Sequence, residues 1–291
     1  MGTGQSTFWN QCPLSANTPK DLRRQISVMQ TKCSTIIPNR KFRIVMCSPS
    51  NHGKSSSINN ILAALEGTYG QTANVRDHPE HGAEKYIEYM MLIDDSAISP
   101  FVMCETPGLR NDLSTDDEEV QTEAIKSAII GKFKSGQELN YMKLTLQQLE
   151  QMEIRDECAI CVIFVIDVRT VKPDMTRTSN AFQSIRNILD FVQRKDLKVA
   201  CLLTNCDKFN NKVKEDLKHM YKSQTIQNAR ELLATQFTGL PINRIFPIVN
   251  YAEKLQVDDD MMVQSLFALN HIMGDITSHF RKRVDVPSNL H

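Results

Sequence analysis

The stretch from Phe42 to Leu65 constrains the fold more than any other part of the chain. The apolar run over residues 42–47 predicts a buried strand, and residues 55–65 predict a helix with one apolar face. The loop between them fits the pattern G-x-x-x-x-G-K-S/T, except that Ser48 stands where the first glycine would be. Such a loop between a buried strand and an amphipathic helix predicts a phosphate-binding corner. An ordinary strand–turn–helix corner is the alternative at this point.

The residues of this loop are chemically suited to phosphate groups. In a loop of this type, backbone N–H groups and the helix N-terminus surround phosphate oxygens. Lys54 would neutralise the outer phosphates, and the Ser55 hydroxyl would ligate Mg²⁺. The predicted phosphate-binding residues of the loop are Ser48, Asn51, His52, Gly53, Lys54, Ser55 and Ser56.

Composition narrows the class of protein. The 291 residues suffice for one large α/β domain or two small ones. The 34 basic and 34 acidic residues give a formal net charge of +0, so no basic excess favours a nucleic-acid partner. No apolar run approaches the roughly 20 residues of a membrane-spanning helix, and no secretory signal is visible. The eight cysteines fall largely in apolar runs, which predicts free thiols in a cytosolic protein. The Cys158-x-x-Cys161 pair has no second cysteine pair or histidine at zinc spacing, so we expect it to belong to the core and not to a metal site.

The N-terminus carries a lipidation pattern. Residues 1–6 fit M-G-x-x-x-S/T, which makes Gly2 a candidate for myristoylation, although so short a pattern also arises by chance. One acyl chain anchors weakly, and basic residues near position 20 or acylation of Cys12 would supply a second signal. We therefore expect weak membrane association at most. A helix is predicted from Pro19 to about Lys32.

The loop over residues 67–82 has the position of a first switch that contacts the nucleotide. Thr68 or Thr72 could reach Mg²⁺, and the sequence does not choose between them. A cluster of aspartate, glutamate and histidine over residues 77–81 could also bind a metal ion. Its spacing fits no ligand geometry of a helix or strand, which favours a solvated loop.

A second site follows the strands predicted over residues 85–93 and 101–104. Glu105 would hold Mg²⁺ through water, and the N–H of Gly108 would meet the terminal phosphate. GTPases normally have aspartate at the position of Glu105. Leu109 occupies the place of the glutamine that orients the attacking water, so no catalytic residue is assigned and any GTPase activity is expected to be weak.

The middle of the chain continues the alternation of helices and strands. Thr115 and Glu118 predict a capped helix over residues 115–130, and residues 131–156 are interpreted as a surface insertion. Residues 158–167 form a continuous apolar run, which is typical of a central parallel strand covered on both faces. A helix is expected over residues 179–192.

A third site follows the strand predicted over residues 199–203. The sequence from Thr204 to Asp207 fits the guanine-reading pattern N/T-K-x-D, in which the aspartate accepts from the ring N–H and the exocyclic amine. Asn205 replaces the lysine whose stem normally covers the base, which predicts weaker affinity. A last strand over 243–249 leads to Asn250, where a backbone N–H would meet the guanine carbonyl. Further helices are predicted over 213–221, 224–235 and 259–280.

Three motifs, each after an apolar strand, favour an open α/β sheet whose ligand edge lies at the strand carboxyl ends. Segments 101–109, 165–167, 204–207 and 246–251 also resemble the interferon-induced protein 44 family, over roughly residues 40 to 280. The resemblance implies a P-loop NTPase fold (G domain) with a mostly parallel central sheet and helices on both faces. It also implies GTP or GDP with Mg²⁺ as ligand and a cytoplasmic innate immune or antiviral role. We expect a tail and helix over 1–38, the G domain over 39–284 and a tail over 285–291.

Three functions remain open from the sequence. The first is a guanine-nucleotide-binding protein with slow or partner-dependent hydrolysis. The second is a pseudo-GTPase scaffold, motivated by the departures at Ser48, Asn51, Glu105 and Asn205. Asn51 stands where the family has a second glycine, and asparagine tolerates left-handed backbone. The third, an adenosine-nucleotide phosphotransferase, is disfavoured by Asp207. An unknown protein partner and a homodimer are both compatible with the sequence.

Overall fold

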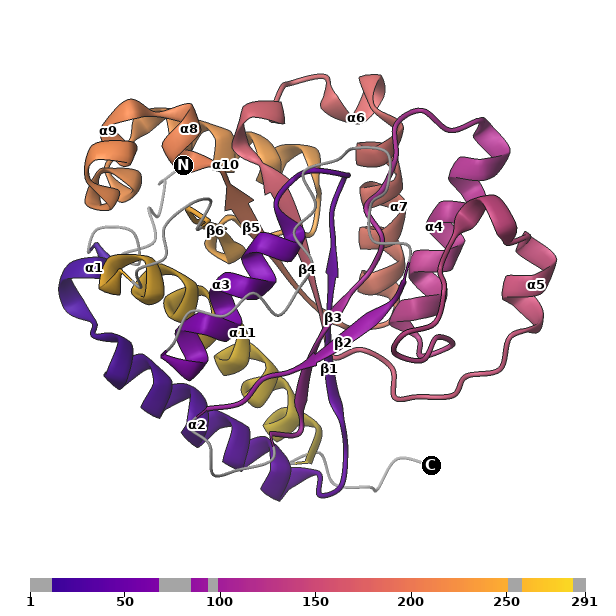
Figure 1. Ribbon diagram of the computed structural model, residues 1–291, viewed down its shortest axis with the longest axis horizontal. Coiled ribbons are helices and arrows are strands. Elements are labelled where there is room, and N and C mark those ends of the chain that lie inside the picture. Colours follow the sequence, from indigo (N-terminus) through magenta and orange to yellow (C-terminus); the bar gives the residue numbers. More distant parts are fainter. Residues whose placement is uncertain (1–11, 68–84, 94–98, 251–257, 285–291) are drawn as a thin grey trace.

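The computed structural model describes residues 12–67, 85–93, 99–250 and 258–284, and Figure 1 shows a central sheet flanked by helices. The sheet has six strands in the order β2-β3-β1-β4-β5-β6. Only the edge strand β2 runs antiparallel to its neighbour, and the other strand pairs are parallel. The strands are β1 (Phe42–Cys47), β2 (Ile87–Met90), β3 (Phe101–Glu105), β4 (Cys161–Asp167), β5 (Lys198–Thr204) and β6 (Ile245–Pro247).

The helices lie between and around these strands, close to the predicted positions. They are α1 (Pro13–Ala16), α2 (Pro19–Ile36), α3 (Lys54–Glu66), α4 (Thr115–Ile129), α5 (Leu146–Gln151), α6 (Met175–Thr178), α7 (Asn180–Arg194), α8 (Cys206–Phe209), α9 (Asn211–Glu215), α10 (Gln224–Gln236) and α11 (Asp259–Val284). The predicted cap of α4 at Thr115 is wrong by one residue, because the Ser114 side chain accepts from the N–H of Asp117. The helix predicted over 213–221 is divided into α9 and a 3₁₀ turn, Leu217–Tyr221.

Two hydrophobic cores lie on the two faces of the sheet. Alternate side chains of β4 belong to opposite cores: Phe164 packs with α4, α7 and α10, whereas Val165 packs with α2, α3 and α11. Figure 1 shows α3 and α11 on one side of the sheet and α4 and α7 on the other. A strand covered on both faces has no solvent side, which explains its unbroken apolar sequence. The predicted fold class, a P-loop α/β fold with a mostly parallel sheet and helices on both faces, is confirmed.

The N-terminal helix α2 packs against α11 and shares its core. Leu22, Ile26 and Cys33 are buried there, and Arg23 donates to the carbonyl of Ala64 on α3 at 2.7 Å. The division of the chain at residue 38 stays a prediction. All eight cysteines are free thiols. Within the described residues, no helix is both long and apolar enough to cross a membrane.

The segment over residues 131–156 is more than a surface insertion, and that prediction is wrong in part. Phe133, Leu139 and Leu149 are fully buried in the core beneath α4. Tyr141 is also buried, and its hydroxyl donates to the carbonyl of Gly108 at 2.7 Å. The segment therefore contacts one of the predicted phosphate-binding residues.

Candidate functional site

The loop between β1 and α3 lies at the carboxyl edge of the sheet, and the backbone N–H groups of residues 51–53 in it have no partner in the described part of the chain. Asn51 and Gly53 have left-handed backbone, with φ of 64° and 86°, and Gly53 caps α3. The first N–H groups of a helix have no partner within the helix. Among the described residues, none accepts a hydrogen bond from the N–H groups of residues 51–56. Successive N–H groups in such a turn form a concave anion site.

The Lys54 side chain lies against Glu105 at the bottom of this loop. Lys54 Nζ donates to Glu105 Oε1 at 2.7 Å, and the two side chains are 6% and 2% exposed. The Ser55 hydroxyl donates to the same carboxylate oxygen, and the Tyr89 hydroxyl donates to Oε2 at 3.0 Å. Burial favours the neutral acid, but the charge of Lys54 and these hydrogen bonds outweigh it and hold the pKa of Glu105 below its usual value.

This ion pair predicts a pH dependence of stability. Because the folded state lowers the pKa of Glu105, the carboxylate stabilises the fold fully above the pKa of an unfolded glutamate, about 4.3. That contribution is lost as the pH falls through the lower folded pKa. The unfolding free energy of the wild type should therefore approach that of Glu105→Gln below about pH 4. Urea titrations at several pH values measure the difference, and a difference that is independent of pH would contradict the assignment.

His52 ties the loop to the sheet. Its Nδ1 accepts from the N–H of Asp167 at 3.0 Å, and its carbonyl accepts from the Thr204 hydroxyl at 2.8 Å. Burial lowers the pKa of His52 to about 4, with the Arg169 charge acting in the same direction and Asp167 opposing it. A neutral imidazole can accept at pH 7, so His52 and Thr204 anchor the loop to the ends of β4 and β5.

Two other predicted guanine-binding residues also anchor the site with their side chains. Asn205 has left-handed backbone, with φ of 57°, and its Nδ2 donates to Asp167 at 2.8 Å. Asn250 donates to the carbonyl of Gly53 at 3.1 Å and accepts from residues of α3. Asp207 differs from both, because it is partly exposed in α8 and has no hydrogen bond or ion pair with a described residue. Of the predicted base-reading side chains, that of Asp207 is thus available to a ligand.

Several hydrogen bonds hold the segment after Glu105 in place at Gly108 and Leu109. The Leu109 N–H donates to the Ser48 carbonyl and the Ser50 N–H donates to the Leu109 carbonyl, both at 2.8 Å. A Cβ on Gly108 would lie 2.9 Å from the Ser50 Cα, so only glycine fits there. Sequence reasoning missed Tyr141, which holds the Gly108 carbonyl. The signal in the sequence that could have found Tyr141 is the set of apolar residues on either side of it, Phe133, Leu139 and Leu149, because an exposed insertion would lack them.

Removal of the Tyr141 hydroxyl should loosen this peptide. In Tyr141→Phe the Gly108 carbonyl loses a buried donor, worth roughly 1 kcal/mol. Because the peptide is held locally, we expect amide hydrogen exchange at Leu109 to speed up by about fivefold. Exchange measured by NMR or mass spectrometry tests this. Unchanged exchange at Leu109 would show that the hydroxyl does not fasten the peptide.

The donor set fits the ligands that the motifs imply. The Ser55 hydroxyl and the Glu105 carboxylate meet at one point, and oxygen donors of this kind suit Mg²⁺. Ser56 lies in the first turn of α3 and is partly exposed. Gly2, Thr68, Thr72, the acidic and histidine cluster at 77–81 and Tyr251 lie outside the described residues. In the part of the chain that is described, no three histidine, cysteine or acidic side chains could together hold a metal ion.

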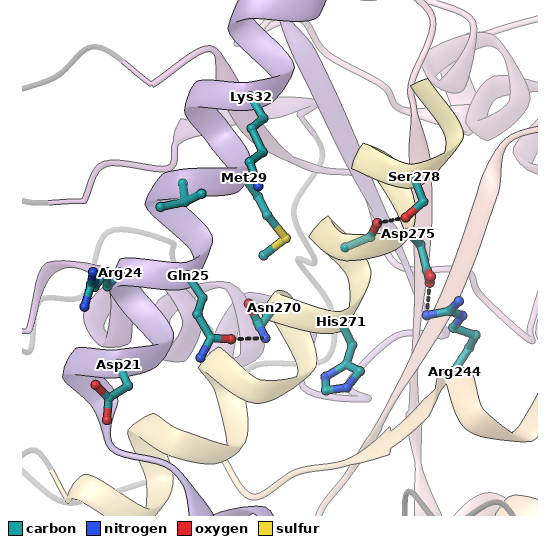
Figure 2. A pocket seen from close by; sticks show the side chains of 12 residues that line it. Asp21, Arg24, Gln25, Met29, Lys32, Arg244, Asn270, His271, Asp275 and Ser278 are labelled. Carbon is teal, nitrogen blue, oxygen red and sulfur yellow. Dashed lines mark hydrogen bonds and ion pairs between the residues drawn. The ribbon is translucent and has the colours of Figure 1, made fainter. Parts of the chain in front are cut away.

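A separate groove of about 690 Å³ lies between α2 and α11. Figure 2 shows that Gln25 and Asn270 bridge it and that Arg244 pairs with Asp275 on its wall. Arg244 directly precedes β6, so this groove is at the amino end of the sheet. The phosphate loop is at the opposite, carboxyl end, and the groove does not belong to the candidate site.

Comparison with known proteins supports the resemblance. No protein-family model matches the chain. Interferon-induced protein 44 of Mus musculus is 24% identical over 254 residues, and interferon-induced protein 44-like of Homo sapiens is 22% identical over 238 residues. Human interferon-induced protein 44 is 23% identical over 239 residues. The chain is a homologue of these proteins. The alignments cover 80% of this chain but only 51–56% of the relatives, so the chain spans about half their length.

Solved structures with a similar outline include a probable GTP-binding protein and Toc33. A probable GTP-binding protein engB has a TM-score of 0.44 at 15% identity and covers 81% of this chain and 99% of its own. Toc33 from Arabidopsis thaliana has a TM-score of 0.47 at 11% identity and covers 89% of this chain and 95% of its own. The fold assignment rests on the strand order and on the loop between β1 and α3.

Proposed function

We propose that this protein binds GTP or GDP with Mg²⁺ at the carboxyl edge of the sheet, and hydrolyses GTP slowly or only with a partner. The observation that carries the proposal is the run of N–H groups over residues 51–56, which have no acceptor among the described residues, together with the buried ammonium group of Lys54 in the same loop. Such a cradle with a buried ammonium group is suited to a di- or triphosphate. The homology to interferon-induced protein 44 supports an interferon-linked role.

Binding requires the Lys54–Glu105 contact to rearrange. Lys54 donates to Glu105 in the free protein, so its ammonium group must move toward the phosphates to neutralise them. Ser55 and Glu105 would then be released to hold Mg²⁺, Ser55 directly and Glu105 through water. Bound Mg²⁺ would supply charge neutralisation at the phosphate oxygens. Part of the binding energy is therefore used to separate a buried pair, which favours moderate affinity.

Slow hydrolysis is inferred from Leu109. Its side chain is 1% exposed and packs in the core, so it cannot orient an attacking water. Tyr141 and Ser50 hold the peptide around it in place. A partner protein, or a second copy of the chain, would have to supply the missing group.

Asp207 permits a test that leaves the fold intact. Because Asp207 has no hydrogen bond or ion pair with a described residue, Asp207→Asn should alter stability little, whereas it replaces the carboxylate that accepts from guanine. Two charge-assisted hydrogen bonds correspond to roughly a hundredfold in affinity. Isothermal titration should show that loss for GTP and no loss for inorganic tripolyphosphate, which has no base, with Asp190→Asn on the exposed face of α7 as matched control. Equal GTP affinity of the two variants would contradict the assignment.

A second candidate function is a scaffold whose pocket is vestigial. It is favoured by the internal contacts of Lys54, Asn205 and Asn250, which satisfy these side chains without a ligand. If the wild type binds no nucleotide in the same titration, the scaffold function replaces guanine-nucleotide binding as the proposed function.

The cellular setting is also part of the proposal. We infer a cytoplasmic protein of the interferon-linked, antiviral response, with an unidentified protein partner and weak membrane association through an acyl chain on Gly2. Mass spectrometry of the N-terminal peptide from expressing cells tests the acylation. An unmodified N-terminus would remove the membrane part of the proposal.

A further inference from the structure

Arg169 lies beside the base-reading edge of the site, at the end of β4. It belongs to the 3₁₀ turn Val168–Thr170, which lies against α8. Its Nε donates to both carboxylate oxygens of Asp167, at 3.0 and 3.1 Å, and its Nη2 donates at 2.5 Å. Two donor groups on one carboxylate fix the plane of the guanidinium as well as its position.

The guanidinium is held firmly but remains open to solvent. The Asp167 side chain is 4% exposed, whereas that of Arg169 is 49% exposed. Asp167 raises the pKa of Arg169 by hydrogen bonding and by charge, and the charge of Asp207 adds to this effect. Asp207 is therefore within electrostatic reach of Arg169. A cation with a fixed plane and a free surface thus lies on a turn that packs against α8, the helix that carries the carboxylate that would read guanine.

Asn205 cannot cover a base bound at Asp207. Its side chain is short, and its Nδ2 is engaged by the same Asp167 carboxylate that holds Arg169. The arginine guanidinium is planar and weakly hydrated, and it stacks on aromatic faces and nucleobases. Arg169 can therefore stack on a base, which the Asn205 side chain cannot do, and both side chains are held by the Asp167 carboxylate.

We propose that Arg169 covers one face of the guanine base, positioned by Asp167, and so determines the affinity of the site for a base. This inference rests on the proposed nucleotide function and adds a residue to it. Asp167 is then a positioning residue. If the role of Arg169 were purely structural, its guanidinium would only balance the charge of Asp167. The Asp167 carboxylate also accepts from the backbone N–H of Arg169 and from the Asn205 side chain.

The affinities for GTP and for inorganic tripolyphosphate, each measured with Mg²⁺, distinguish an Arg169 that covers the base from one that is purely structural. Tripolyphosphate engages the phosphate loop but has no base. In Arg169→Ala we expect GTP to bind roughly tenfold more weakly, as for loss of one stacking contact, while tripolyphosphate affinity stays the same. Arg169→Lys keeps the charge but not the plane, and it should bind GTP nearly as weakly as Arg169→Ala. Arg194→Ala, at an exposed arginine of α7, is the matched control and should equal the wild type.

The outcomes separate this inference from the proposed function. Unchanged GTP affinity in Arg169→Ala, or equal losses for GTP and tripolyphosphate, would overturn the role of Arg169 and leave the nucleotide site standing. A wild type that binds neither ligand would overturn the proposed function itself. A wild type that binds tripolyphosphate but not GTP would overturn base recognition and the role of Arg169 together.

Discussion

Replacement of Lys54 by alanine should lower the unfolding free energy of the ligand-free protein by about 3–5 kcal/mol. The reason is that Glu105 is 2% exposed and would be left as an uncompensated buried charge. Ser55 and Tyr89 would still donate to it, but neither carries a positive charge. Urea denaturation followed by circular dichroism measures the loss.

The matched control is the double variant Lys54→Met with Glu105→Gln, which removes both charges. We expect it to recover most of the lost stability, because a buried pair replaced as a whole costs far less than a broken one. A second control is Lys143→Ala, which breaks the exposed pair with Glu138 and should leave the unfolding free energy almost unchanged, because solvent screens exposed pairs. If Lys54→Ala costs less than about 1 kcal/mol, the pair does not stabilise the fold.

This result would change how functional assays are interpreted. Substitution of the phosphate-loop lysine is an obvious way to remove nucleotide binding. Here the same substitution also destabilises the fold through Glu105, so loss of activity in Lys54→Ala would not by itself implicate a nucleotide. Asp207→Asn avoids the difficulty, because Asp207 has no hydrogen bond or ion pair with another described residue.

The second large loss of stability is expected when Arg43 in β1 is replaced. The Arg43 side chain is fully buried, and its guanidinium donates to the Tyr86 hydroxyl, to the carbonyls of Ala128 and Glu157, and to Glu88. Arg43→Met keeps the length of the side chain but leaves these acceptors without their donor. We expect a loss of about 3–5 kcal/mol in unfolding free energy.

Arg110→Met provides the comparison for Arg43→Met. Arg110 pairs with Asp112 at 2.6 Å, but the two side chains are 45% and 67% exposed. Exposed pairs of this kind contribute about 0–1 kcal/mol to the unfolding free energy. A short distance between the charged atoms therefore does not by itself predict a large contribution to stability. Equal losses in the two variants would contradict the view that burial decides the contribution of each arginine.

The main elements of the fold could be predicted from the sequence because their signals are local. The apolar run of β1, the glycine-lysine-serine turn and the helix α3 lie within 25 residues of each other. The left-handed backbone at Asn51 agrees with the tolerance expected of asparagine. Boundaries were less accurate, since β4 begins at Cys161 and not at residue 158.

The internal contacts of the site could not be predicted, because they join residues far apart in the sequence. Tyr141 and Gly108 are separated by 33 residues, and His52 and Asp167 by 115. Motif spacing identified Thr204 as a base reader, but its hydroxyl holds the His52 carbonyl. A motif places a residue at the correct edge of the sheet, and tertiary packing then decides what its side chain contacts. Ligand contacts of these residues stay predictions.

The melting temperature of the wild type with Mg²⁺ and excess GTP, GDP or ATP tests the nucleotide site most directly. A ligand at a hundredfold its dissociation constant adds about 2.7 kcal/mol of stability, which is visible as a rise of several degrees. We predict that GTP and GDP raise the melting temperature and that ATP does not. No rise with any nucleotide, or a larger rise with ATP than with GTP, would contradict a guanine-nucleotide site.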